Sequence, residues 1–157
     1  TQKPETPLDF DISKAVEMSS ENPVFYVQYA HARIYSLLRK IDDGEFGFKS
    51  HTDLSDISPN LTHSGEISLI KKISFWPSVI LSAAERNEPH RIVYYLQELA
   101  NLFHSHWNEG SRNIELRFIN IDDETTTKSR ILLCLGVLNV LSNGLKIIGV
   151  RPVEEMR

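Results

Sequence analysis

Apolar residues recur every three or four positions along most of the chain, the spacing at which side chains return to one face of an α-helix. Alternation of apolar and polar residues, which is typical of a half-buried strand, is confined to the short stretch 114–120. We therefore expect an all-α fold, a bundle of about five or six helices. The predicted helices run over residues 12–19, 22–41, 66–75, 77–86, 89–110 and 128–148.

Residues suited to helix ends support two of these boundaries. Asn22 is a good N-cap because its side chain can accept backbone hydrogen bonds, and Pro23 suits the first helical position. Thr126 or Thr127 could cap the last helix, and Gly149 is placed to end it.

The chain has the length of one compact domain, at 157 residues. Residues 1–10 contain two prolines and no apolar periodicity, so we expect a junction there and a helical domain over 11–157. Residues 42–65 are rich in Gly, Asp, Ser and Pro, which predicts a long loop. The chain begins with Thr1 rather than methionine, so we expect a processed protein or an excised fragment.

Composition places the chain among soluble globular proteins, with 41% apolar and 24% charged residues. The single cysteine, Cys134, rules out an internal disulfide, and its apolar surroundings predict a buried thiol. The run "ILLCLGVLNVL" is too short to span a bilayer, so we expect it in the core. No signal peptide is recognisable, and these features predict a cytoplasmic protein with no membrane partner.

The charge is distributed unevenly. A net charge of −4 argues against a nucleic-acid partner for the chain as a whole. The segments 22–41 and 126–151, however, contain basic residues and no acidic ones, whereas acidic residues gather in 42–66. This pattern is compatible with solvated helix faces, and it also leaves two segments free to approach a polyanion.

The helix predicted over 22–41 has an unusual second face. At 100° per residue, Tyr26, Tyr29, Arg33 and Lys40 fall within roughly 60° of one another. Phenol rings stack on unpaired bases and arginine contacts phosphates or base edges, so this stripe is suited to single-stranded RNA. The alternative is that both tyrosines pack under another helix and that Arg33 meets a carboxylate. The opposite face should enter the core with Val24, Val27, Ile34, Leu38 and Ile41.

The histidines do not predict a metal site. His104 and His106 would point about 200° apart on a helix, so they cannot share an ion, and His51 and His63 lie in the loop without a nearby cysteine. His31 falls on the core side of its helix, where a packed histidine is expected. No catalytic set can be assigned from spacing, so we expect neither catalytic nor metal-binding residues.

Three blocks of sequence carry a family resemblance: "NPVFYVQYAHARI", "IVYYLQELANLFHSHWN" and "RILLCLGVLNVLSNGLKIIGVRPVEEM". Together, in this order, they resemble the C-terminal anticodon-binding domain of arginyl-tRNA synthetase, the helical domain of the DALR type. "TPLDFDISKA" looks like the junction that leaves the catalytic domain of that enzyme. The match is weakest across 42–65, and Arg157 extends one residue beyond the methionine with which many members end.

The resemblance implies a class I synthetase anticodon-binding domain whose partners are an arginine tRNA and the catalytic domain of the same chain. By the same resemblance, Tyr26, Tyr29, Arg33 and Met156 would lie around the anticodon loop. Lys40 is a further candidate for tRNA binding, because it belongs to the same stripe of the helix. The family's nucleotide-binding signature is absent here, so ATP and magnesium would belong to the catalytic domain and this chain alone should be inactive and cofactor-free. We expect a monomer. The competing hypothesis is a helical protein-interaction module that uses Tyr26 and Tyr29 as a hot spot.

Overall fold

The computed structural model describes residues 22–44, 46–50 and 60–156. The helix predicted over 12–19 and the predicted junction 1–10 lie outside these residues. No strand occurs in the described part of the chain, so the all-α prediction is confirmed. The elements are α2 (Pro23–Asp43), α3 (Ser64–Ser74), α4 (Trp76–Glu85), α5 (His90–Arg112), the 3-10 helix η1 (Ile114–Leu116) and α6 (Glu124–Ile147).

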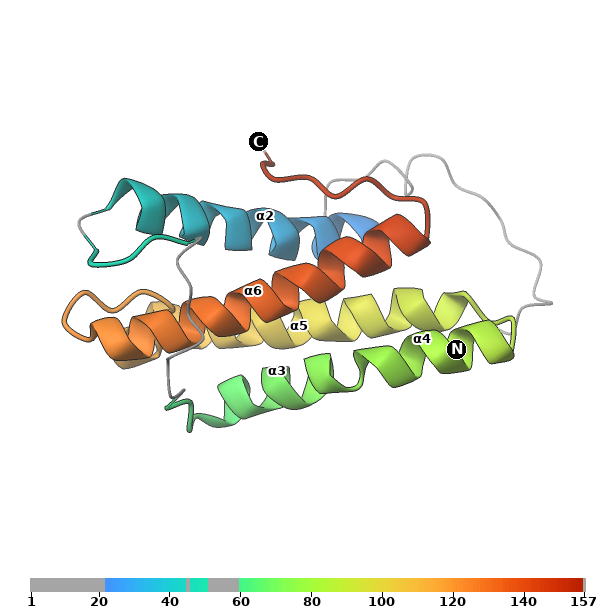
Figure 1. Cartoon of the computed structure of the whole chain (residues 1–157), viewed down its shortest axis with the longest axis horizontal. Coiled ribbons are helices and arrows are strands. Elements are labelled where there is room, and N and C mark those ends of the chain that lie inside the picture. Colours follow the sequence, from blue (N-terminus) through green and yellow to red (C-terminus); the bar gives the residue numbers. More distant parts are fainter. Residues whose placement is uncertain (1–21, 45, 51–59, 157) are drawn as a thin grey trace.

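The helices α3 and α4 follow one another along one side of the bundle, separated only by Phe75 (Figure 1). The five α-helices of the described residues therefore form four long helical segments, because α3 and α4 are nearly continuous. Counted as segments, they are slightly fewer than the five or six helices expected. The strand-like stretch 114–120 begins with the single turn η1 instead of a strand. The Asn113 side chain accepts a hydrogen bond from the Glu115 N–H at 3.0 Å, and this cap favours the turn.

One predicted helix cap is confirmed and the other is wrong. The Asn22 side chain accepts hydrogen bonds from the N–H groups of the two residues that open α2 after Pro23, at 3.1 and 3.3 Å. The helix α6 begins at Glu124, earlier than predicted, because Asp123 is its N-cap and accepts from the Thr126 N–H at 2.9 Å. Thr127 turns inward and its hydroxyl donates to the Asn120 carbonyl at 2.8 Å.

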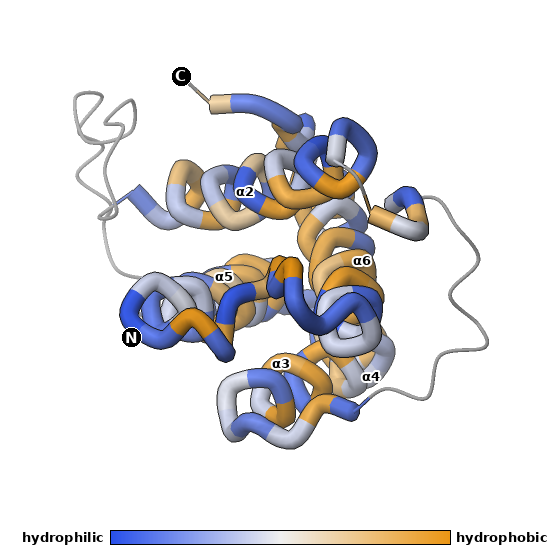
Figure 2. The backbone as a smooth tube through the Cα atoms, turned by 90° about the vertical axis from the view of Figure 1, so that its left-hand side faces the viewer, coloured by the Kyte–Doolittle hydropathy of each residue, from blue (hydrophilic) through white to orange (hydrophobic). Residues whose placement is uncertain are grey.

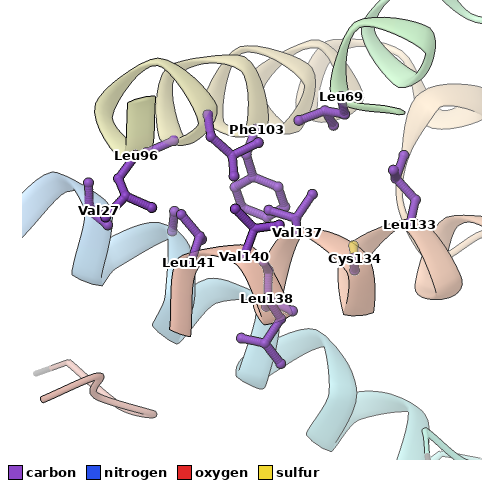
Figure 3. Close-up of a cluster of buried hydrophobic side chains, with 14 of the residues drawn as sticks. Val27, Leu69, Leu96, Phe103, Leu133, Cys134, Val137, Leu138, Val140 and Leu141 are labelled. Carbon is purple, nitrogen blue, oxygen red and sulfur yellow. The ribbon is translucent and has the colours of Figure 1, made fainter. Parts of the chain in front are cut away.

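The helix α6 packs against α2, α3 and α5 (Figures 1 and 2). Figure 3 shows its apolar side chains meeting Leu96 and Phe103 of α5. A Cβ at Gly144 would lie 2.5 Å from Leu96, so glycine lets these two helices approach closely there. Cys134 is fully buried, as predicted, and burial raises the pKa of its thiol.

The predicted core face of α2 needs one correction. Val27, Ile34, Leu38 and Ile41 are buried, but Val24 keeps 39% of its surface exposed. Because Val24 lies in the first turn, the core face of α2 begins one turn later than the pattern predicts.

Two segments, Ser64–Glu85 and Glu124–Ile147, are long and apolar enough to cross a membrane by length and composition alone. Core helices of soluble proteins pass the same test, and half of the most apolar window of Glu124–Ile147 is buried inside the bundle. This finding is therefore weak evidence for a membrane span.

A buried ion pair joins α3 to α6. Arg130 donates from Nε to Glu66 Oε1 at 2.7 Å and from Nη1 to the carbonyls of Glu115 and Arg117, at 2.7 and 2.8 Å. The second carboxylate oxygen of Glu66 accepts from the His63 N–H at 3.1 Å, which completes a capping box at the start of α3. Both charged groups are thus partnered on several sides, as burial requires.

We expect Glu66→Gln to lower the free energy of unfolding by about 3–5 kcal/mol, because it leaves the buried Arg130 charge without its counterion. Urea unfolding monitored by circular dichroism measures the loss. Glu98→Gln is the matched control, because it breaks the exposed pair with Lys72 and should cost less than about 1 kcal/mol. Equal losses in the free energy of unfolding for the two variants would show that the buried pair contributes no more to stability than the exposed one.

Candidate nucleic-acid interface

The residues after α6 turn back and run along α2 (Figure 1). Gly149 adopts φ +77°, a left-handed conformation that glycine tolerates without strain, and the Val150 N–H donates to the Leu145 carbonyl at 2.8 Å. We call residues 150–156 the C-terminal tail. Its course brings the end of the chain beside a helix that lies more than a hundred residues earlier in the sequence.

Two polar side chains of α2 hold the backbone of the C-terminal tail. Gln28 donates from Nε2 to the Arg151 carbonyl at 2.8 Å and accepts from the Val153 N–H at 3.0 Å. His31 lies between the Val153 carbonyl, 2.6 Å from Nδ1, and the Ser142 hydroxyl, 2.8 Å from Nε2. The carbonyl requires a proton on Nδ1, and because burial keeps the ring neutral at neutral pH, Nε2 accepts from the Ser142 hydroxyl. Burial lowers its pKa, and the predicted packed histidine is confirmed.

The C-terminal tail and α2 enclose an open cavity of about 330 Å³. We call it the α2–tail pocket. It brings together three of the residues predicted to contact RNA, Tyr29, Arg33 and Met156, from opposite ends of the chain. Its full lining is Tyr29, Ala32, Arg33, Ser36, Arg39, Glu155 and Met156.

Arg33 is fixed inside an aromatic layer between α2 and α5. Its guanidinium carbon lies 4.2 Å from the centre of the Tyr29 ring and 4.9 Å from that of Trp107. Its Nη2 donates to the Tyr29 hydroxyl at 2.8 Å, and its Nη1 lies 3.0 Å from His104 Nδ1. The arginine therefore carries its charge to the floor of the α2–tail pocket in a defined orientation.

The same contacts fix the protonation of His104. Because Arg33 can only donate, Nδ1 of His104 must accept, and Nε2–H then donates to the Tyr26 carbonyl at 3.3 Å. Burial, with a smaller contribution from the Arg33 charge, lowers the pKa of His104 to about 4. His104 is therefore a neutral, buried support beneath the Arg33 guanidinium at neutral pH.

The outward stripe predicted for α2 is correct for some of its members only. Tyr29 is 37% exposed and Lys40 is exposed, but Tyr26 is half-buried against the core, with its ring 4.4 Å from that of His104. The outward orientation predicted for Tyr26 is thus wrong, because α5 covers this side of the helix. Lys40 lines a different cavity, of about 430 Å³, which it shares with Trp107.

Sequence reasoning missed the residues that build the α2–tail pocket from below. Gln28 and Trp107 were given no role, and His104 was considered only as a metal ligand. Gln28 was detectable in principle, since it is a polar residue three positions from His31 and both lie among buried apolar positions. The pairing of Arg33 with α5 was not detectable, because it depends on how two helices cross.

The chain is similar in sequence and in fold to known proteins. The family model of the DALR anticodon binding domain matches residues 27–156. Curated relatives include arginine–tRNA ligases of Ruegeria pomeroyi, 48% identical over 100% of this chain, and Bartonella henselae, 43% identical over 99%. The chain spans about 27% of the length of each. A solved Thermus thermophilus arginyl-tRNA synthetase matches 99% of this chain and 24% of its own, with a TM-score of 0.74 at 29% identity.

We expect the fold to lose stability as pH falls from about 6.5 to about 4, partly through His104. Its pKa is about 4 when folded and about 6.5 when unfolded, so the unfolded chain binds the proton first. This contribution is fully present above pH 6.5 and amounts to at most about 3 kcal/mol across the interval. Urea unfolding at pH 7 and pH 5 should show a smaller loss for His104→Gln than for the wild type. The same loss in both proteins would contradict the assignment.

Proposed function

Since the chain belongs to the DALR anticodon-binding domain family, we propose that it binds the anticodon loop of arginine tRNAs as the C-terminal part of an arginine–tRNA ligase. The observation that carries this proposal is the α2–tail pocket, which gathers Tyr29, Arg33 and Met156 in one place. An aromatic ring, a fixed cation and an adaptable thioether are a combination suited to a splayed-out base.

The α2–tail pocket has the dimensions and chemistry for one such base. Its volume of about 330 Å³ lies at the lower end of the range, roughly 300–1,000 Å³, of pockets that hold small molecules. The half-exposed Tyr29 ring offers a stacking surface, and Arg33 and Arg39 supply positive charge for phosphates. Backbone groups near Met156 would read the edge of the base, as proteins do with unpaired RNA bases.

The genetic code indicates which base is read. Arginine codons carry G in the second position, so every cognate anticodon has C in the middle. A domain that identifies arginine tRNAs can therefore use this cytosine as its signal. Extruding it from the stacked loop costs a few kcal/mol, which stacking on Tyr29 would offset in part.

The remaining predicted contacts have narrower roles in this proposal. Tyr26 supports the site through its contact with His104 rather than by stacking on RNA. Lys40 lies outside the α2–tail pocket, where it would contact the phosphate backbone beyond the bound base.

The rest of the parent enzyme is also part of the proposal. The named ligase relatives are longer than this chain, and we assign ATP and magnesium to their catalytic domain, reached through residues 1–10. Such an enzyme would act in the cytoplasm, and we propose a monomer. The protein-interaction module is not favoured, because the family and the α2–tail pocket both support RNA.

We expect Tyr29→Ala to weaken binding of an arginine tRNA by at least about 1–3 kcal/mol, the contribution of one stacked base, because the variant also removes the ring and the hydroxyl that hold Arg33. The fold should survive, because Tyr29 lies on the exposed side of α2. Filter binding or fluorescence titration measures the affinity for a cognate tRNA and for one whose middle anticodon base is changed. The wild type should prefer cytosine, and the variant should lose most of this preference.

Tyr94→Ala is the matched control, because Tyr94 is another exposed tyrosine that lines a separate cavity at the α4–α5 side of the bundle. It should leave tRNA affinity unchanged. If Tyr29→Ala weakens both tRNAs equally and the wild type shows no preference for cytosine, Tyr29 belongs to a general RNA or packing surface and the recognition model is wrong.

A further inference from the structure

A second polar cluster lies between α3 and α5 and takes no part in the proposed RNA site. It consists of His63, the N-cap residue of α3, and of His106 and Glu109 on α5. One nitrogen or oxygen from each of these side chains lies within 4.8 Å of the others. His106 and Glu109 are three positions apart, so they share one face of the helix.

The distances are close to those of a metal site. His106 Nδ1 and His63 Nδ1 lie 3.7 and 3.8 Å from Glu109 Oε2. Zinc bonds to nitrogen and oxygen are about 2.0–2.2 Å long, which places neighbouring ligand atoms of a tetrahedral ion about 3.3–3.5 Å apart. The two nitrogens would each have to move a few tenths of an ångström closer to Glu109 Oε2, and the two imidazole rings would have to approach each other by somewhat more. The three atoms would then have the spacing of zinc ligands.

His106 gives the second and independent reason to look for a ligand here. The residue is 1% exposed, and neither ring nitrogen has a hydrogen-bond partner among the described residues. Buried polar atoms are nearly always partnered, and an orphan costs about 1–3 kcal/mol. The other two buried histidines, His31 and His104, have partners for both nitrogens.

The surroundings of His106 favour the metal-binding form of the ring. A neutral imidazole binds a metal through the lone pair of an unprotonated ring nitrogen, and no hydrogen-bond donor among the described residues occupies that lone pair in His106. A Cβ at Gly65 would lie 2.7 Å from Nδ1, so the glycine leaves room for the ring at this point. Glu109 is exposed and His63 is half-buried, which leaves the cluster open to solvent on one side.

We propose that His63, His106 and Glu109 bind one divalent transition-metal ion. Two imidazoles and a carboxylate form a ligand set that suits zinc, and water can complete the coordination sphere. The nearby Glu66 is already paired with Arg130, so Glu109 is the carboxylate that would bind the ion. The ion would join the start of α3 to the C-terminal third of α5 and stabilise the bundle without touching the α2–tail pocket.

Binding would replace one existing hydrogen bond. His63 Nδ1 accepts from the Gly65 N–H at 3.2 Å, and its lone pair cannot serve the helix cap and the metal together. The other half of the capping box, from the His63 N–H to Glu66 at 3.1 Å, would remain and hold the start of α3 in place.

Calorimetric titration of the 157-residue chain with Zn²⁺ tests the proposal, together with thermal unfolding with and without the ion. We expect one Zn²⁺ per chain and a rise in Tm that chelation with EDTA reverses. Glu109→Gln keeps the size of an exposed side chain and should weaken binding at least about tenfold, and His106→Gln should do the same. Cys134 is fully buried and should not compete for the ion.

His90→Gln is the matched control, because it removes an exposed histidine from the first position of the same helix. It should bind Zn²⁺ like the wild type. The proposal is overturned if the wild type binds no stoichiometric Zn²⁺, or if Glu109→Gln binds as tightly as the wild type. In either case His106 has only a packing role, with its ring edge-on against Phe118, and binds no metal. Because tRNA binding is not the readout, failure here leaves the proposed function unaffected.

Discussion

The burial of α6 is the constraint on which the other features depend. Its side chains are apolar on nearly every side, so α2, α3 and α5 must all lie against it (Figure 2). Each fully buried leucine or valine contributes about 1.5–3 kcal/mol, whereas one hydrogen bond contributes about 0.5–1.5 kcal/mol net. Apolar burial therefore holds the helices together, and the polar contacts at the two ends of α6 determine how the neighbouring segments are oriented against it. Near the start of α6, Arg130 pairs with Glu66 of α3. After the end of α6, the C-terminal tail runs back along α2 and is hydrogen-bonded to Gln28.

Three buried histidines illustrate how one residue type serves different purposes in this fold. His31 connects the C-terminal tail to α6 through both nitrogens, and His104 positions Arg33 while capping a carbonyl of α2. His106 is equally buried but has no such partners in the described residues. The first two therefore stabilise the α2–tail pocket as neutral rings. Of these three histidines, only His106 lacks a partner among the described residues that explains its burial.

Local signals in the sequence determined what could be predicted. Helical periodicity and the Asn22–Pro23 start gave the elements, and the 100° rotation per residue placed Tyr29 and Arg33 together on α2. The same rotation could not say which side of α2 another helix would cover, so the orientation of Tyr26 was wrong. Contacts between distant segments were equally inaccessible. His63 meets His106 only because α3 lies against α5, and spacing within one helix had seemed to exclude a metal pair.

The packing around Arg33 affects how selectively the α2–tail pocket could bind one RNA base over another. A free arginine side chain carries about 2 kcal/mol of rotamer entropy, which a flexible contact would lose when RNA binds. Here Tyr29, Trp107 and His104 already hold the guanidinium in place, so most of that cost is met during folding. Among the described residues, Tyr29 and His104 engage two of the five donors of Arg33, and in the proposed complex the other donors would face a phosphate or a base. In the proposed complex, a charge fixed in this way would favour one position of the RNA loop over its neighbours, as the reading of a single anticodon base requires.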